Sequence, residues 1–171
     1  MTGTADGAAE PIRGIVVMPE AFSDRVPSSS DRDDSDRERS VLLVSRDERV
    51  ADSLRVGVSR VAGRVDRTDS AEDAVRVTRG LWYDAVLVDA GLGDEAFSVC
   101  ESLREGPGGP AVVLYAERAS LELATAAMRS GAFDLLSGEV GGDEFADRIG
   151  KALRESSTRR AAGEREARLK K

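Results

Sequence analysis

Three short apolar runs divide the chain, and each lies between turn-favouring residues and a longer segment with helical periodicity. The runs are Val41–Val44, Ala85–Val88 and Ala111–Leu114. Uninterrupted apolar runs of this length are typical of parallel strands that are buried on both faces of a sheet. The pattern therefore predicts a central parallel sheet, with Asp89 directly after one of its strands.

Between these runs, apolar residues recur at intervals of three and four, as on the buried face of an amphipathic helix. Ser70 begins one such segment as a helix cap and Gly80 closes it, while Gly131 stops another in the C′ position. The predicted helices cover 50–61, 70–80, 94–103, 120–129 and 143–153, with a short strand at 63–68. Strands that alternate with helices in this way predict an α/β fold: a doubly wound five-stranded parallel sheet, order 2-1-3-4-5, with five helices.

The two ends of the chain lack this alternation. Residues 1–40 are rich in Ser, Asp, Arg, Gly and Pro without a hydrophobic period, which predicts a disordered N-terminal tail. The stretch Ile12–Phe22 is more apolar, and we interpret it as a chance patch rather than a docking segment. Residues 155–171 keep helix-forming residues without an apolar stripe, which predicts an extended, charged C-terminal helix after a domain at 41–154.

Composition excludes several classes of function. The absence of histidine removes Ser-His and Cys-His catalysis, histidine metal ligands and an internal phosphohistidine relay. Cys100 is the single cysteine, so there is no internal disulfide, and its helical spacing predicts a buried, inert thiol. A net charge of -7 gives no reason to expect nucleic acid or membrane as partner of this domain. We expect a cytoplasmic protein.

Polar residues collect at the carboxyl edge of the predicted sheet, where α/β proteins place their active groups. They are Ser45, Arg46, Asp47, Asp89, Tyr115, Gly138 and Glu139.

This layout resembles the receiver domain of two-component response regulators over roughly residues 40–154. Asp89 stands where that family has its phospho-accepting aspartate, and Gly131–Leu136 resembles the family's Gly-Ala-x-Asp-Tyr-Leu. The resemblance implies a flavodoxin-like receiver fold and a role in phosphorelay signal transduction rather than enzymatic activity. It also implies partners such as a histidine kinase, a phosphotransfer protein or another signalling protein, and allows a homodimer.

The site departs from the family pattern at most other positions. Ser45 and Arg46 stand in place of two acids that help to bind Mg²⁺, Tyr115 replaces a small hydroxyl residue, and Gly138 replaces a lysine. The formal charge beside Asp89 thereby changes from about -2 to about +1, and one unit charge pair at about 4 Å is worth on the order of 4 kcal/mol. We therefore expect no metal site, an ion pair between Arg46 and Asp89, and an Asp47 side chain that projects away.

These departures favour an atypical, degenerate receiver that acts mainly as a protein-interaction module. The interaction face implied by the resemblance includes Leu121, Ala124 and Met128, although core packing would serve at least half of them. A different possibility is a working phosphoacceptor modified at Asp89 by a histidine kinase, for which Mg²⁺ would be needed. A truncated DNA-binding response regulator is also compatible with the sequence. A flavin- or nucleotide-binding enzyme ranks last, because the chain lacks the Gly-rich phosphate motifs.

Overall fold

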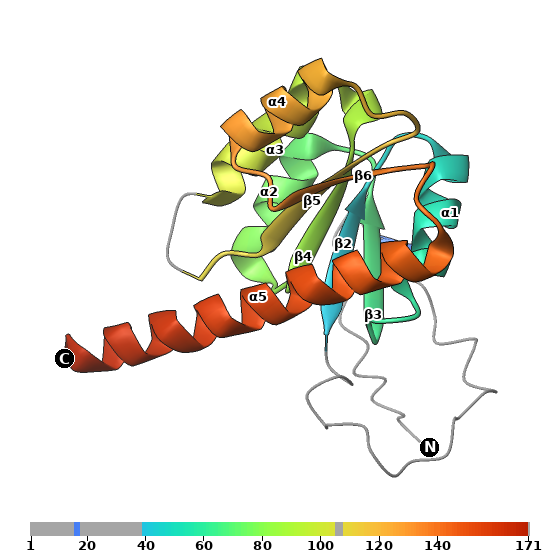
Figure 1. Ribbon diagram of the computed structural model, residues 1–171. Helices are drawn as coiled ribbons and strands as arrows, with labels where there is room; N and C mark the ends of the chain where they lie inside the picture. Colours follow the sequence, from blue (N-terminus) through green and yellow to red (C-terminus); the bar gives the residue numbers. More distant parts are fainter. Residues whose placement is uncertain (1–15, 18–38, 105–107, 171) are drawn as a thin grey trace, which may run out of the picture.

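The chain folds into three layers, with a sheet between two layers of helices (Figure 1). A computed structural model describes residues 16–17, 39–104 and 108–170. The strands are β1 (Val16–Val17), β2 (Ser40–Val44), β3 (Arg64–Thr68), β4 (Ala85–Asp89), β5 (Ala111–Ala116) and β6 (Asp134–Ser137). The helices are α1 (Glu48–Val58), α2 (Ala71–Gly80), α3 (Asp94–Arg104), α4 (Leu121–Ser130) and α5 (Gly142–Leu169), with a 3₁₀ turn, η2, at Ala90–Leu92.

The sheet has the strand order β1-β3-β2-β4-β5-β6. Its five parallel strands, β3-β2-β4-β5-β6, have the predicted order 2-1-3-4-5 when they are counted along the chain without β1, so the predicted fold is confirmed. The sequence pattern did not predict β1, which pairs antiparallel with β3 through Val16 opposite Arg67 and Val17 opposite Asp66. The rest of the predicted disordered tail, up to residue 38, lies outside the described residues.

Two separate hydrophobic clusters form because side chains alternate between the two faces of each strand. On one face, Leu42, Val44, Val86 and Val88 pack against α2, α3 and α4. On the other face, Val41, Leu43, Ala85 and Leu87 pack against α1 and α5. The central strands β2 and β4 are buried on both sides, which explains why their sequences are continuous apolar runs.

Helix ends follow the predicted signals. The Ser70 hydroxyl accepts a hydrogen bond from the Asp73 backbone N–H at the start of α2, and Ser120 caps α4 in the same way through Leu123. Gly131 ends α4 with φ +87°, a left-handed conformation that side chains disfavour. Cys100 is fully buried in α3, as expected.

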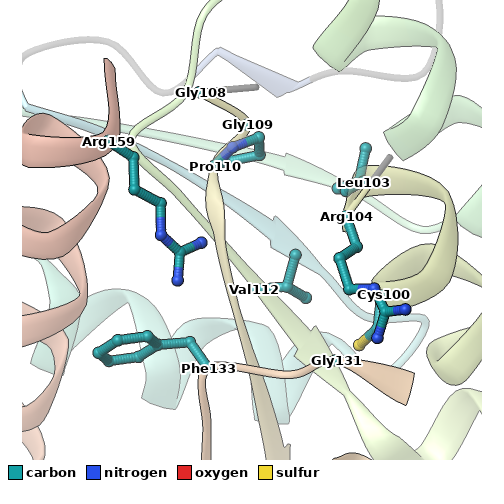
Figure 2. A pocket seen from close by; sticks show the side chains of 10 residues that line it. All are labelled: Cys100, Leu103, Arg104, Gly108, Gly109, Pro110, Val112, Gly131, Phe133 and Arg159. Atoms are coloured by element: carbon teal, nitrogen blue, oxygen red, sulfur yellow. The ribbon is translucent and has the colours of Figure 1, made fainter. Parts of the chain in front are cut away.

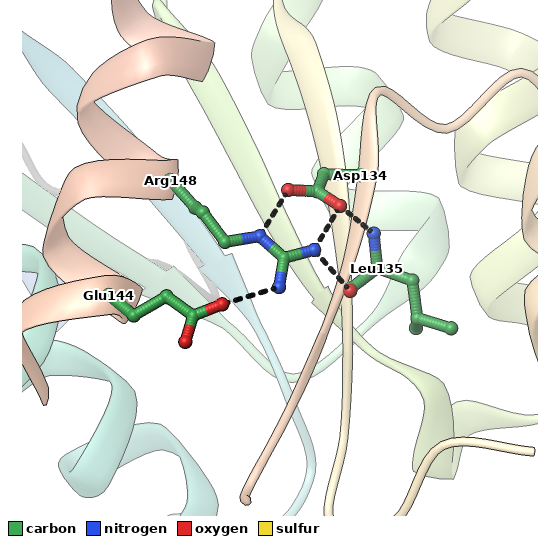
Figure 3. A network of polar contacts seen from close by, with 4 residues as sticks. All are labelled: Asp134, Leu135, Glu144 and Arg148. Carbon is green, nitrogen blue, oxygen red and sulfur yellow. Dashed lines mark hydrogen bonds and ion pairs between the residues drawn. The ribbon is translucent and has the colours of Figure 1, made fainter. Parts of the chain in front are cut away.

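An ion pair holds α5 against β6 (Figure 3). Arg148 donates from Nε to Asp134 Oδ2 at 2.8 Å and from Nη2 to Asp134 Oδ1 at 2.5 Å, and Nη2 also contacts the Leu135 carbonyl at 3.1 Å. The hydrogen bond to Asp134 is the main reason that the pKa of Arg148 is raised. This bidentate geometry fixes the orientation of α5 as well as its position.

The helix α5 continues for 28 residues and passes along the amino-terminal edge of the sheet (Figure 1). Ser156 is fully buried, and the Arg160 guanidinium lies 4.6 Å from the centre of the Trp82 ring. The extension is therefore packed on the domain at least as far as Arg160. None of the helices in the described part of the chain has the length and apolar character required of a membrane-spanning segment.

Candidate functional site

Asp89 lies at the carboxyl end of β4, where only 9% of its surface is exposed. Both carboxylate oxygens accept hydrogen bonds from the chain itself. Ser45 Oγ donates to Oδ2 at 2.7 Å, and the Gly91 backbone N–H donates to Oδ1 at 2.8 Å. Hydrogen bonds to an ionised acceptor are short and strong, so this carboxylate is held in one orientation without any added ligand.

Ser45 is fully buried because it follows directly after β2, the strand next to β4. Its hydroxyl oxygen also accepts a hydrogen bond from the Asp47 backbone N–H at 3.2 Å. The Asp47 carboxylate is exposed and caps α1, where it accepts from the N–H of Arg49 at 2.9 Å and of Val50 at 3.4 Å. Asp47 thus points away from Asp89, as expected.

The expected ion pair between Arg46 and Asp89 is wrong. Arg46 pairs instead with Glu95, in the first turn of α3, at 2.6 Å, and both side chains are at least half exposed. This hydrogen bond is the main cause of the raised pKa of Arg46, followed by the Glu95 charge. Arg46 does not reach Asp89 because successive side chains at the end of a strand point to opposite sides. Ser45 points inward, so the Arg46 side chain points outward to solvent. A guanidinium would also lose hydration beside the buried Asp89.

The sequence reasoning missed Arg67, which lies in β3 opposite Leu43. Arg67 Nη2 donates to the Ser45 carbonyl oxygen at 3.2 Å, while its buried Nε has no hydrogen-bond partner. Arg67 thus supports the backbone that carries the Ser45 hydroxyl. The strand register could have located it, because parallel pairing of β2 with β3 places Arg67 next to the end of β2.

Tyr115 and Gly138 occupy the other side of the site. Tyr115 pairs with Asp89 across β4 and β5, and burial, followed by the charges of Glu117 and Asp89, raises the pKa of its phenol. A methyl group at Gly138 would lie 3.0 Å from both the Tyr115 hydroxyl and the Glu117 carbonyl oxygen. The phenol and the glycine therefore fit each other, and a longer side chain at 138 would displace the tyrosine.

The Mg²⁺ that the family resemblance implies does not fit these residues. The side chain that hydrogen-bonds to Asp89 is the Ser45 hydroxyl, not a second carboxylate, and Arg46 pairs with Glu95. The described residues contain no group of three or more His, Cys, Asp or Glu that could hold a metal ion. Magnesium prefers oxygen ligands that include carboxylates, and this site offers one carboxylate that already accepts two hydrogen bonds.

The predicted interaction face lies on α4, which is a different element from the β4 strand that carries Asp89. Leu121 is 80% exposed and Met128 is 58% exposed, whereas Ala124 is half-buried. Leu121 and Met128 are therefore not part of the core, which was the competing explanation for these residues.

Comparison with models of protein families gives no match. The chain is 29% identical over 116 residues to the transcriptional regulatory protein AfsQ1 of Streptomyces coelicolor, which covers 67% of this chain and 51% of that protein. A response regulator from Thermotoga maritima superposes with a TM-score of 0.61 at 18% identity, covering 68% of this chain and 98% of the other. The chain has the receiver-domain fold of response regulators.

A second solved receiver domain agrees with this. The signal receiver domain of an HD domain-containing protein from Pseudomonas fluorescens gives a TM-score of 0.65 at 19% identity, covering 80% of this chain and 97% of the other. The similarity to both solved structures thus lies in the receiver-domain fold. The chain spans about half the length of the curated relative, 51%.

Proposed function

We propose that this receiver is degenerate and acts as a non-enzymatic protein-interaction module of a two-component pathway. The observation that carries the proposal is the Asp89 carboxylate, whose two oxygens are occupied by Ser45 Oγ and the Gly91 N–H. Phosphoryl transfer relies on cations that neutralise the transferred oxygens. At this site the nearest arginine of the β2–α1 loop, Arg46, is engaged by Glu95 instead.

The test is labelling by acetyl phosphate in the presence of Mg²⁺, read by intact-protein mass spectrometry. We expect no phosphoryl adduct on the wild-type protein and none on the Asp89→Asn control. Combining Ser45→Asp and Arg46→Asp with Tyr115→Thr and Gly138→Lys restores the family pattern, and this variant is expected to gain Mg²⁺ affinity and labelling. Efficient labelling of wild-type protein that is lost in Asp89→Asn would refute the degenerate site.

Labelling of the wild-type protein that is lost in Asp89→Asn would support another candidate function, a working phosphoacceptor at Asp89. The observation that favours it is position, because Asp89 ends a central strand and its Ser45 contact is a single hydroxyl that could rotate. A histidine kinase or phosphotransfer protein would then be the phosphoryl donor, with Mg²⁺ as the required ion.

The interaction role is assigned to the apolar residues on α4. Leu121 and Met128 are exposed large hydrophobic side chains on one helix, and such residues favour contact with a partner protein when they lie together. Partners of this face would be a signalling protein or a second copy of the chain. Sedimentation equilibrium of Leu121→Asp with Met128→Asp tests the second copy, with the exposed Val56→Asp in α1 as matched control. Equal association of both variants and wild type would exclude a homodimer through α4.

The curated relative is named a transcriptional regulatory protein, and this chain matches about half of it, 51%. The corresponding proposal is that this receiver regulates a DNA-binding output domain, with the basic end of α5 as the connection. A gel-shift assay would test it by comparing DNA binding of this receiver alone with DNA binding of a longer natural protein in which an output domain follows the receiver.

A further inference from the structure

A hollow lies at the amino-terminal edge of the sheet, opposite the edge that carries Asp89. It encloses about 60 Å³ between the end of α3, the start of β5, the α4–β6 turn and the extension of α5 (Figure 2). Since roughly 10–15 Å³ measured in this way holds one water, the hollow has room for several waters or one small ion.

The charged residues in the lining are Arg104 and Arg159, and the other lining residues are glycine, proline or apolar side chains and Cys100. No hydrogen bond or ion pair joins Arg104 to another described residue. Arg159 pairs with Glu155 through Nε at 3.4 Å, which leaves both Nη groups available. Two guanidinium groups therefore line one hollow, and none of its described lining residues is acidic.

Backbone geometry brings the segments that carry the two arginines close to the hollow. A methyl group at Gly131 would overlap Arg104 Cδ, so the absence of a side chain there lets the Arg104 stem lie against the α4–β6 turn. Gly108, with φ +78°, lies beneath α5, and a methyl group on it would be 3.7 Å from Arg160 Cα. This contact places the α5 extension at the rim of the hollow. Figure 2 shows Arg159 and Arg104 on opposite sides of Pro110 and Val112, with the Arg159 guanidinium above Phe133 and the Arg104 guanidinium beside Cys100 and Gly131.

We propose that this hollow binds a small oxyanion the size of inorganic phosphate. Guanidinium groups donate paired N–H bonds that match phosphate oxygens, and here two of them have donors to spare. The chain has a net charge of -7, so its overall field repels anions, and binding must come from these local contacts. The proposal is independent of phosphorylation at Asp89, because the two sites lie at opposite edges of the sheet.

The intact protein supplies its own reporter. Trp82 is the only tryptophan in the chain, and its ring contacts Arg160, the neighbour of Arg159 in α5. Inorganic phosphate is titrated against sodium chloride at matched ionic strength, while Trp82 emission and the melting temperature are recorded. We expect a saturable change with phosphate that chloride does not reproduce, together with a higher melting temperature.

Arg104→Gln and Arg159→Gln each should weaken phosphate binding roughly tenfold, the loss of one charge-assisted contact. Both side chains are exposed, so neither change disturbs the core. Arg168→Gln, in the last turn of α5 and outside the lining, is the matched control and should bind like the wild type. The proposal is overturned if wild type responds equally to phosphate and chloride, or if Arg168→Gln loses as much affinity as the two lining variants.

Discussion

Removing the Ser45 hydroxyl should destabilise the fold by leaving Asp89 Oδ2 buried without its donor. The bond is 2.7 Å long, Ser45 is fully buried and Asp89 is 9% exposed, so water replaces the lost donor poorly. A hydrogen bond to a charged group in such surroundings contributes about 1.5–3 kcal/mol. We expect Ser45→Ala to lower the free energy of unfolding by about 2 kcal/mol, measured by urea denaturation at neutral pH.

A double-mutant cycle separates this contact from other effects of each change. Ser45→Ala and Asp89→Ala should show a coupling energy of about 1.5–3 kcal/mol. The matched cycle pairs Arg46→Ala with Asp89→Ala, and its coupling should be close to zero, because Arg46 contacts Glu95 instead. A large coupling between Arg46 and Asp89, with none between Ser45 and Asp89, would show that this account of the site is wrong.

Two further predictions concern the packing of the helices. Gly57→Ala should destabilise the protein by about 1–3 kcal/mol, because the new methyl group would lie 2.6 Å from the Phe145 ring. This cost outweighs the better helix propensity of alanine. Gly80 has open space around it, so Gly80→Ala should be neutral or stabilising in the same denaturation assay. Burial raises the pKa of the Cys100 thiol from an ordinary 9.0 to about 11, so the neutral thiol is favoured in the folded state. The contribution of the neutral thiol to the free energy of unfolding is complete below pH 9.0. Above this pH it is lost at about 1.4 kcal/mol per pH unit, up to about pH 11. Wild type should therefore lose stability faster than Cys100→Ala over this interval, and parallel curves would contradict the assignment.

The sequence was a sufficient guide to the parallel sheet, because the continuous apolar strands and the helix cap at Ser70 each have one straightforward structural interpretation. It was insufficient for β1, where two residues gain their strand conformation only from pairing with β3. In the candidate site, too, one feature could be predicted from the sequence and another could not. The position of Asp89 follows from the strand pattern, whereas the partner of Arg46 lies 49 residues away in α3 and depends on how the two loops meet.

The close fit between Tyr115 and Gly138 constrains the order in which substitutions could return this site to the family pattern. A lysine introduced at 138 while Tyr115 is present would begin with its β-carbon 3.0 Å from the phenol oxygen. The same lysine introduced after Tyr115→Thr would meet only the Glu117 backbone at that distance. The cost of gaining the lysine thus depends on which residue occupies position 115. The two positions are therefore coupled in one direction: a side chain at 138 is easier to gain once Tyr115 has been replaced, whereas Tyr115→Thr meets no such contact while Gly138 is present.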